Sequence, residues 1–80
     1  MDIKSDVLDF IRNEVLEDPL LELNESDKLL SQGILDSLGL MRTVRFLEKK
    51  YKFTIPFEDI NLDNFDCINS INEYVYKVNN

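Results

Sequence analysis

Ser37 carries the hydroxyl group of this chain that is best placed for chemistry. It stands between Asp36 and Leu38 at the expected start of a helix, about midway along 80 residues. A helix N-terminus favours a bound anion, because its free amides and the helix dipole both attract negative charge. Serine and aspartate are also favoured helix caps, and local chemistry alone favours Ser37 as a cap. Only one of the two side chains can occupy that position.

The two glycines of the chain flank this serine. Gly33 is expected to permit a turn that other residues resist. Gly39 lies inside the expected helix, where glycine costs about 1 kcal/mol relative to alanine. Two interpretations of Gly39 stay open. It could allow tight packing of the helix against a loop, or a close approach by a partner or prosthetic group beside Ser37.

Other residues capable of catalysis or metal binding are few. The chain has no histidine, which excludes a Ser-His-Asp triad and a histidine general base. Cys67 is the only cysteine, so an internal disulfide and a structural zinc site are excluded. Cys67 is expected to be a buried residue at a helix start. The acidic stretches at 58–59 and 63–66 lack the spacing of a calcium loop and are interpreted as solvated surface. We therefore expect no metal site and no enzymatic activity.

Apolar periodicity predicts an all-α fold, and the chain length allows one domain, residues 1–80. Apolar residues at helical spacing predict helices over 3–16, 37–51 and about 67–78. Pro19 is expected to end the first of these, because proline disfavours helix in the residue before it. The expected inward faces comprise Ile3, Val7, Phe10, Ile11 and Val15 in the first helix, Leu40, Met41, Val44, Leu47 and Tyr51 in the second, and Ile68, Ile71, Val75 and Val78 in the last.

Two further segments connect these helices. Residues 17–36 are expected to form an ordered loop, with a short helical turn at 27–30, pinned over the helix ends by apolar side chains. Pro56 introduces a short third element around 57–62, and the carboxylate of Asp66 is expected to cap the last helix. The expected architecture is a four-helix bundle with a long first loop and a short third helix. The apolar side chains of the loop are Leu20, Leu21, Leu23, Leu29, Leu30, Ile34 and Leu35.

Charge is unevenly distributed along the chain. The net charge is −7, yet residues 37–52 carry a local charge of +4 and the remainder −11. On a helical wheel Leu38 falls on the polar face of the second helix, beside Arg42, Arg45 and Lys49. An exposed leucine among cations is typical of a docking contact with a partner. The acidic remainder should repel nucleic acid and anionic lipid, so neither is expected as a partner.

The motif, its position and the chain length together resemble the acyl carrier protein family. Asp36-Ser37-Leu38 at the start of the second helix, the long leucine-rich loop before it and the Ile55-Pro56 break after it match that family over nearly the whole chain. The resemblance implies an acyl-carrier-type bundle in which 4'-phosphopantetheine is esterified to Ser37 and its thiol holds a cargo as a thioester. It also implies that Asp36 and Leu38 belong to the motif at the attachment site, and that the protein is a substrate of enzymes.

The same resemblance implies three kinds of partner: a phosphopantetheinyl transferase, an acyl or aminoacyl ligase or acyltransferase, and downstream pathway enzymes. Carriers of fatty acid synthesis present an acidic second helix, whereas this one is basic. We therefore expect a carrier of a dedicated pathway, whose enzymes offer a less basic or an acidic docking surface. Acyl cargo is slightly favoured over aminoacyl cargo, although Gly39 and Phe65-Asp66 are also similar to D-alanyl carrier proteins.

Location and the rival class of function follow from simpler features. No apolar run reaches the length of a membrane span, and the first residues lack the pattern of a signal peptide, so a cytoplasmic location is expected. A monomer is also expected. The rival is a helical interaction module that is never modified, with Leu38 and the neighbouring arginines as its docking face. That module would account for the charge distribution, but not for two glycines flanking a serine at a helix start.

Overall fold

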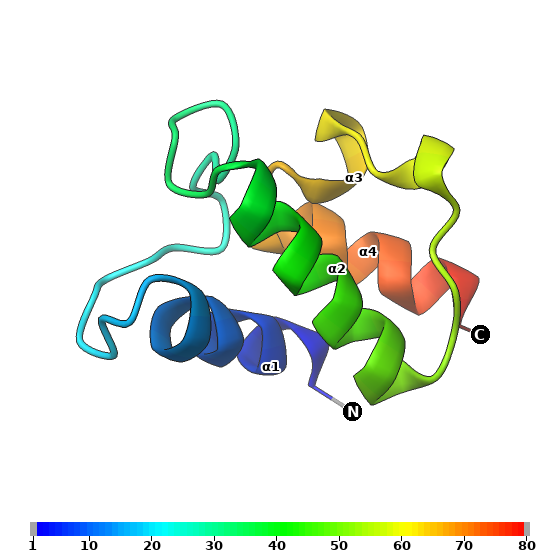
Figure 1. The fold of residues 1–80 in the computed structure, drawn as a ribbon, viewed down its shortest axis with the longest axis horizontal. Coiled ribbons are helices and arrows are strands. Elements are labelled where there is room, and N and C mark those ends of the chain that lie inside the picture. The colour runs from blue at the N-terminus through cyan, green and yellow to red at the C-terminus, as the bar shows by residue number, and fades with distance from the viewer. Residues whose placement is uncertain (1, 80) are drawn as a thin grey trace.

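The computed structural model describes residues 2–79, which form four α-helices and no strand (Figure 1). The helices are α1 (Ile3–Phe10), α2 (Ser37–Tyr51), α3 (Leu62–Phe65) and α4 (Ile68–Val78). α1 packs against both α2 and α4, and the short α3 packs against α4. The predicted all-α four-helix fold, with its long first loop and short third helix, is confirmed. None of the helices in the described range is long and apolar enough to cross a membrane.

The first helical segment ends before Pro19, as predicted, but its last turn is a π-helix. α1 continues directly into this π-helical turn at Ile11–Val15. The Leu16 amide donates to the Ile11 carbonyl, five residues back, at 2.8 Å. Glu17 then takes a left-handed backbone conformation with φ of 52°, which ends the helix and directs the chain into the long loop.

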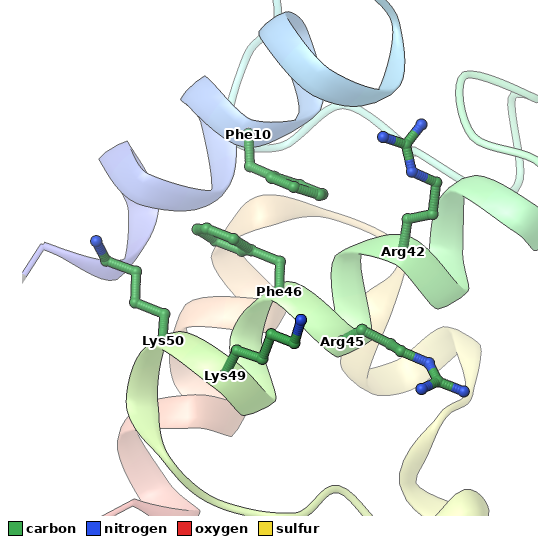
Figure 2. A pocket seen from close by; sticks show the side chains of 6 residues that line it. All are labelled: Phe10, Arg42, Arg45, Phe46, Lys49 and Lys50. Carbon is green, nitrogen blue, oxygen red and sulfur yellow. The ribbon is translucent and has the colours of Figure 1, made fainter.

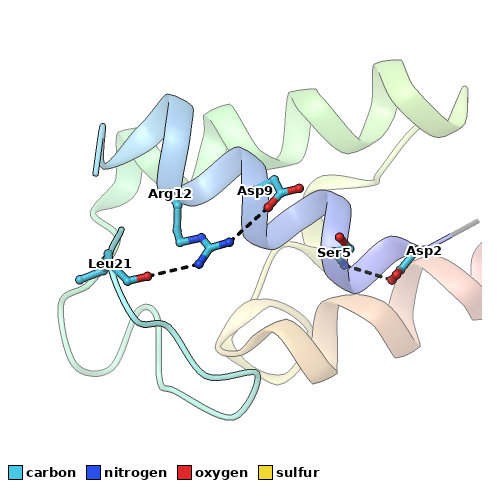
Figure 3. A network of polar contacts seen from close by, with 5 residues as sticks. All are labelled: Asp2, Ser5, Asp9, Arg12 and Leu21. Carbon is cyan, nitrogen blue, oxygen red and sulfur yellow. Dashed lines mark hydrogen bonds and ion pairs between the residues drawn. The ribbon is translucent and has the colours of Figure 1, made fainter. Parts of the chain in front are cut away.

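Polar contacts fix both ends of this segment (Figure 3). At its start, the Asp2 carboxylate accepts a hydrogen bond from the Ser5 amide at 3.1 Å and caps the first turn. At its end, Arg12 donates to the Asp9 carboxylate at 3.3 Å and to the Leu21 carbonyl at 3.4 Å. The second of these bonds holds the first part of the loop against the helix.

One apolar core joins α1, α2, α4 and the loop, and most of the predicted inward positions contribute to it. Three positions differ. Met41 is 37% exposed, and Val78 is 45% exposed at the last position of α4. Phe10 is half-buried and, unlike the half-buried Val15, Leu40 and Tyr51, is not packed against the core cluster. The buried side of α2 is turned toward Gly39 and Thr43, whose hydroxyl donates to the Gly39 carbonyl at 2.9 Å. This rotation carries Met41 out of the core. The largest fully buried apolar side chains are Phe65, Ile11, Leu29, Leu47, Ile68, Ile71, Val7, Val44 and Val75.

Residues 17–36 form an ordered loop held by leucines, as predicted, but two details of the prediction are wrong. Leu20 is 91% exposed and anchors nothing. The expected helical turn at 27–30 is replaced by non-helical turns, because the Leu29 amide donates outside the loop, to the Asp66 carbonyl at 2.6 Å. The buried leucines of the loop are Leu23, Leu29 and Leu35.

The segment between α2 and α4 contains two short elements where one was expected at 57–62. A 3₁₀ turn at Phe57–Asp59 follows Pro56, and α3 begins three residues later. The Asn61 side chain separates the two, since it caps α3 by accepting from the Asn64 amide at 3.0 Å.

Asp66 does not cap α4, contrary to the prediction. Its carboxylate accepts from the Leu30 amide at 3.0 Å, the Ser31 amide at 2.9 Å and the Ser31 hydroxyl at 2.6 Å. Cys67 takes the capping position of α4 without a capping side-chain bond, and it is half-buried instead of buried. Asp66 therefore fastens the long loop to the junction of α3 and α4.

Candidate functional site

Asp36 caps α2, which settles which of the two neighbouring side chains occupies that position. The backbone of Asp36 is extended, with φ of −93° and ψ of −176°. Its Oδ1 accepts from the Gly39 amide at 2.8 Å, and its carbonyl accepts from the Leu40 amide at 2.9 Å. Asp36 thus satisfies the Gly39 and Leu40 amides at the start of α2, and Ser37 becomes the first residue of the helix proper.

The Ser37 hydroxyl does not contribute to the hydrogen bonding of the described fold. Ser37 is exposed, and within residues 2–79 its hydroxyl makes no hydrogen bond. Leu38 beside it is 70% exposed, as the helical wheel predicts. The interpretation of Ser37 as the helix cap is therefore wrong. An exposed hydroxyl at a helix N-terminus, where amides of the first turn remain free to donate, is compatible with a covalently attached phosphodiester.

The two glycines position this turn from either side. Gly33 has a φ of 74°, a left-handed conformation that confirms the predicted turn. Gly39 is buried, and a Cβ there would lie 3.1 Å from Val15 Cγ1 and 3.3 Å from Leu35 Cδ2. Of the two interpretations of Gly39, the geometry supports tight packing of α2 against the π-helical turn and the loop.

The predicted docking residues lie together on the outer side of α2. Arg42, Arg45 and Lys49 are all exposed, and none of them makes an ion pair or hydrogen bond within the described part of the chain. Lys50, one position further, lies 3.8 Å from the Asp6 carboxylate of α1. The outer side of α2 thus presents three cations, Arg42, Arg45 and Lys49, with which no acidic side chain of residues 2–79 pairs.

An aromatic pair that the sequence pattern does not predict lies beside these cations. Phe10 of α1 stacks on Phe46 of α2, with ring centroids 4.3 Å apart and an angle of 13° between the ring planes (Figure 2). The pair lies in an open groove of about 650 Å³, which is also lined by the basic side chains of α2. Phe10 was expected to be core. The one sequence feature that could have indicated the pair is the position of Phe46 directly after Arg45, a residue of the basic face of α2. We call this groove the α1/α2 groove; its lining residues are Phe10, Arg42, Arg45, Phe46, Lys49 and Lys50.

Tyrosine–aspartate hydrogen bonds connect separate elements of the fold. The Tyr51 hydroxyl at the end of α2 donates to Asp6 of α1 at 2.5 Å, and the Tyr74 hydroxyl of α4 donates to Asp59 at 2.7 Å. Burial raises the pKa of both tyrosines, and their carboxylate partners raise it further. No group of three or more possible metal ligands occurs among the residues that the structure describes.

Comparisons with known proteins place the chain in a family. Residues 6–75 match the family described as "phosphopantetheine attachment site". The chain is 32% identical over 80 residues to a D-alanyl carrier protein of Streptococcus mutans, covering 100% of this chain and 99% of the relative. It is 30% identical, with the same coverage, to a D-alanyl carrier protein of Streptococcus sanguinis. A D-alanyl carrier protein of Bacillus subtilis is 28% identical over 71 residues, covering 89% of this chain and 90% of the relative.

These matches agree with the helical fold. In this family 4'-phosphopantetheine is bound covalently to a serine, and the proteins generally act as carriers and not as catalysts. They are served by phosphopantetheinyl transferases and by ligases. The helical fold expected for an acyl carrier protein is the one found here. The chain belongs to the family of phosphopantetheine-dependent carrier proteins.

Proposed function

We propose that Ser37 is the residue that carries 4'-phosphopantetheine. The observation that supports this most directly is that Asp36 caps α2 while the Ser37 hydroxyl is exposed and forms no hydrogen bond within residues 2–79. Because the Asp36 carboxylate caps the helix at 2.8 Å from the Gly39 amide, the neighbouring hydroxyl can be esterified without breaking a bond of the fold. Leu38, 70% exposed beside it, gives a transferase an apolar contact next to the acceptor.

The other serines are less suitable acceptors. The Ser31 hydroxyl donates to Asp66 at 2.6 Å, and the Ser70 hydroxyl lies 3.3 Å from the Cys67 sulfur. Ser5 lies outside the segment that matches the family. Ser26 lies in a turn of the long loop, where no helix N-terminus could hold a phosphodiester. Ser37 combines exposure, a free hydroxyl and the start of a long helix.

On this proposal the chain presents a covalently held cargo to the enzymes that act on it. When bound, the prosthetic group supplies a thiol that holds the cargo as a thioester. The free amides of the first turn of α2 would hold the phosphodiester, and the Asp36 cap would keep that turn formed while enzymes bind. Tethering raises the effective concentration of the cargo at each enzyme that docks on the carrier. The chain itself is then a substrate and contributes no catalytic group.

For the cargo, we propose an amino acid loaded by an adenylating ligase. The support is the set of D-alanyl carrier proteins that align with the chain over nearly its full length. An acyl cargo loaded by an acyl ligase or acyltransferase is the alternative, because the attachment chemistry is the same. A loading assay with a D-alanine ligase and with an acyl ligase, read by intact mass, distinguishes the two.

We further propose that Leu38, Arg42, Arg45 and Lys49 form the docking face for the enzymes of a dedicated pathway. Cations on this face favour acidic enzyme surfaces and disfavour the basic surfaces that suit an acidic second helix. Binding to fatty acid synthesis enzymes as tight as that of the cell's own fatty acid carrier would contradict this. A monomeric state and a cytoplasmic location remain predictions.

The experiment that tests the attachment site is an intact-mass measurement after incubation with coenzyme A and a broad-specificity phosphopantetheinyl transferase. The parent chain should gain one phosphopantetheine group and the Ser37→Ala variant none. If the folded parent gains no mass, Ser37 is not the acceptor, and the unmodified interaction module becomes the better description. If Ser37→Ala is still modified, the group belongs on another serine.

A further inference from the structure

The α1/α2 groove has an aromatic floor. The rings of Phe10 and Phe46 come from different helices, and their stacking at a centroid distance of 4.3 Å leaves both side chains half-buried (Figure 2). Aromatic surface of this kind, with few rotatable bonds, is typical of the anchor positions of protein interfaces. The floor can therefore accept an apolar side chain from a partner.

The walls of the groove carry unneutralised positive charge. Arg42, Arg45 and Lys49 follow one another at spacings of three and four residues, where like charges destabilise a helix. Within the described range no carboxylate pairs with any of them, although the chain as a whole has a net charge of −7. An acidic occupant would relieve this repulsion and would be steered toward the groove.

We propose that the α1/α2 groove binds an acidic segment of a partner protein, which places one apolar side chain against the Phe10–Phe46 pair and carboxylates against the surrounding cations. The volume of about 650 Å³ suits a few residues of a peptide and not an extended surface. An extended polyanion such as nucleic acid or a lipid surface would also meet the remaining −11 of the chain, which repels it. A short acidic segment avoids that repulsion.

The position of the groove leaves the proposed attachment site accessible. Phe46 lies nine residues after Ser37, which at about 100° per residue places the two on opposite sides of α2. A segment seated on the aromatic floor therefore does not cover the Ser37 hydroxyl. The inference extends the proposed docking role of α2, but it does not depend on modification of Ser37.

A titration of the isotope-labelled full chain with a short glutamate-rich peptide containing one central leucine tests the proposal by NMR. The peptide should shift the amides around Phe10 and Phe46, in the parent and in Ser37→Ala alike. Arg45→Glu/Lys49→Glu should weaken binding roughly tenfold, because two attractive contacts become repulsive. The matched control Lys28→Glu/Lys77→Glu makes the same change in net charge away from the groove and should weaken it less than about twofold. Serine in place of the peptide's leucine should also weaken binding.

Several results would overturn the proposal. Equal weakening by the two double variants would show that the peptide senses net charge only. No effect of the central leucine would remove the role of the aromatic floor. Tighter binding of a DNA duplex or of phosphatidylserine-containing vesicles to the same amides would assign the groove to another kind of partner. Self-association by sedimentation that is lost in Arg45→Glu/Lys49→Glu would assign it to a second copy of the chain. A failed titration leaves the intact-mass result for Ser37 unaffected, so the two proposals fail separately.

Discussion

The Asp66 carboxylate accepts two hydrogen bonds from Ser31, 35 residues earlier in the chain: one from the hydroxyl at 2.6 Å and one from the amide at 2.9 Å. A third bond comes from the Leu30 amide at 3.0 Å. These bonds hold the pKa of Asp66 below its ordinary value of 3.8, with the Ser31 hydroxyl as the largest cause. They also fix the loop a few residues before the first turn of α2, where the Asp36–Ser37 pair lies.

The first prediction concerns this attachment of the loop. Asp66→Asn should lower the free energy of unfolding, because the amide nitrogen that replaces Oδ2 cannot accept from the Ser31 hydroxyl, and the uncharged oxygen that remains is a weaker acceptor for the two loop amides. Hydrogen exchange at the Leu30 and Ser31 amides should become at least about tenfold faster. Asp63→Asn, which makes the same change of charge on the exposed side of α3, should leave those amides protected. Unchanged exchange in Asp66→Asn would show that neither the charge of Asp66 nor its bond to the Ser31 hydroxyl is needed to protect these amides.

The same bonds give a pH dependence with a definite sign. A carboxyl whose pKa is lowered on folding contributes stability that is complete above its ordinary pKa and is lost as the pH falls through the lower value. The stability difference between the parent and Asp66→Asn should therefore be constant above about pH 4 and shrink below 3.8. Urea denaturation across this range measures it. A difference that grows on acidification would contradict the prediction.

Local patterns predict the helices well because the signals that define them are local. α2 begins at Ser37 and ends at Tyr51, as the apolar spacing indicates, and Leu38 lies on the exposed side. Asp66 shows where this reasoning fails. A capping rule considers only the amides of the following turn, whereas the amides that Asp66 binds belong to Leu30 and Ser31. No local rule can identify a partner that folding brings from a distant loop.

For the candidate site, as for the fold, the features that depend on local sequence could be predicted, and those that depend on distant contacts could not. The sequence places Asp36 and Ser37 at a helix start but cannot decide which of them caps it, since both residue types are good caps. It also places the cations on the outer face of α2. It could not predict the α1/α2 groove, because the groove exists only where Phe10 meets Phe46 across two helices.

The second prediction separates the cap from the acceptor. Asp36→Ala should lower the free energy of unfolding by about 1 kcal/mol, whereas Asp36→Asn should cost less than about 0.5 kcal/mol because asparagine also caps. Ser37→Ala should change it by less than about 0.5 kcal/mol, since the hydroxyl bonds to no described residue. Chemical denaturation measures all three variants. A loss in Ser37→Ala that equals the loss in Asp36→Ala would contradict the assignment of the cap. If Asp36→Asn keeps its stability but is modified more slowly than the parent, the slower modification reports recognition of the carboxylate by the transferase and not unfolding.

The third prediction concerns the contact of Gly39 with the π-helical turn. Helix propensity alone would make Gly39→Ala stabilising by about 1 kcal/mol. The new methyl group would lie 3.1 Å from Val15 Cγ1, so we expect most of this gain to be lost to crowding. In a Val15→Ala background the crowding is relieved, and Gly39→Ala should become more favourable by about 0.5 to 1 kcal/mol. A double-mutant cycle of unfolding free energies measures this coupling, and equal effects in the two backgrounds would contradict it.

The fourth prediction tests the bond between Tyr74 and Asp59, which ties the 3₁₀ turn to α4. Tyr74→Phe should lower the free energy of unfolding by about 1 kcal/mol at neutral pH, because the ring remains buried and one hydrogen bond is lost. The effect should be smaller in an Asp59→Asn background if the bond to this carboxylate is the cause.

The Tyr74–Asp59 bond also gives a pH dependence. Burial raises the pKa of Tyr74 above its ordinary value of 10.0, and Asp59 raises it further. A tyrosine whose pKa is raised on folding contributes stability that is complete below the ordinary pKa and is lost as the pH rises through the higher pKa. The difference between the parent and Tyr74→Phe should therefore hold up to about pH 10 and then shrink, which urea denaturation at alkaline pH can follow. A difference that already vanishes at neutral pH would mean that water replaces the Asp59 contact at no cost.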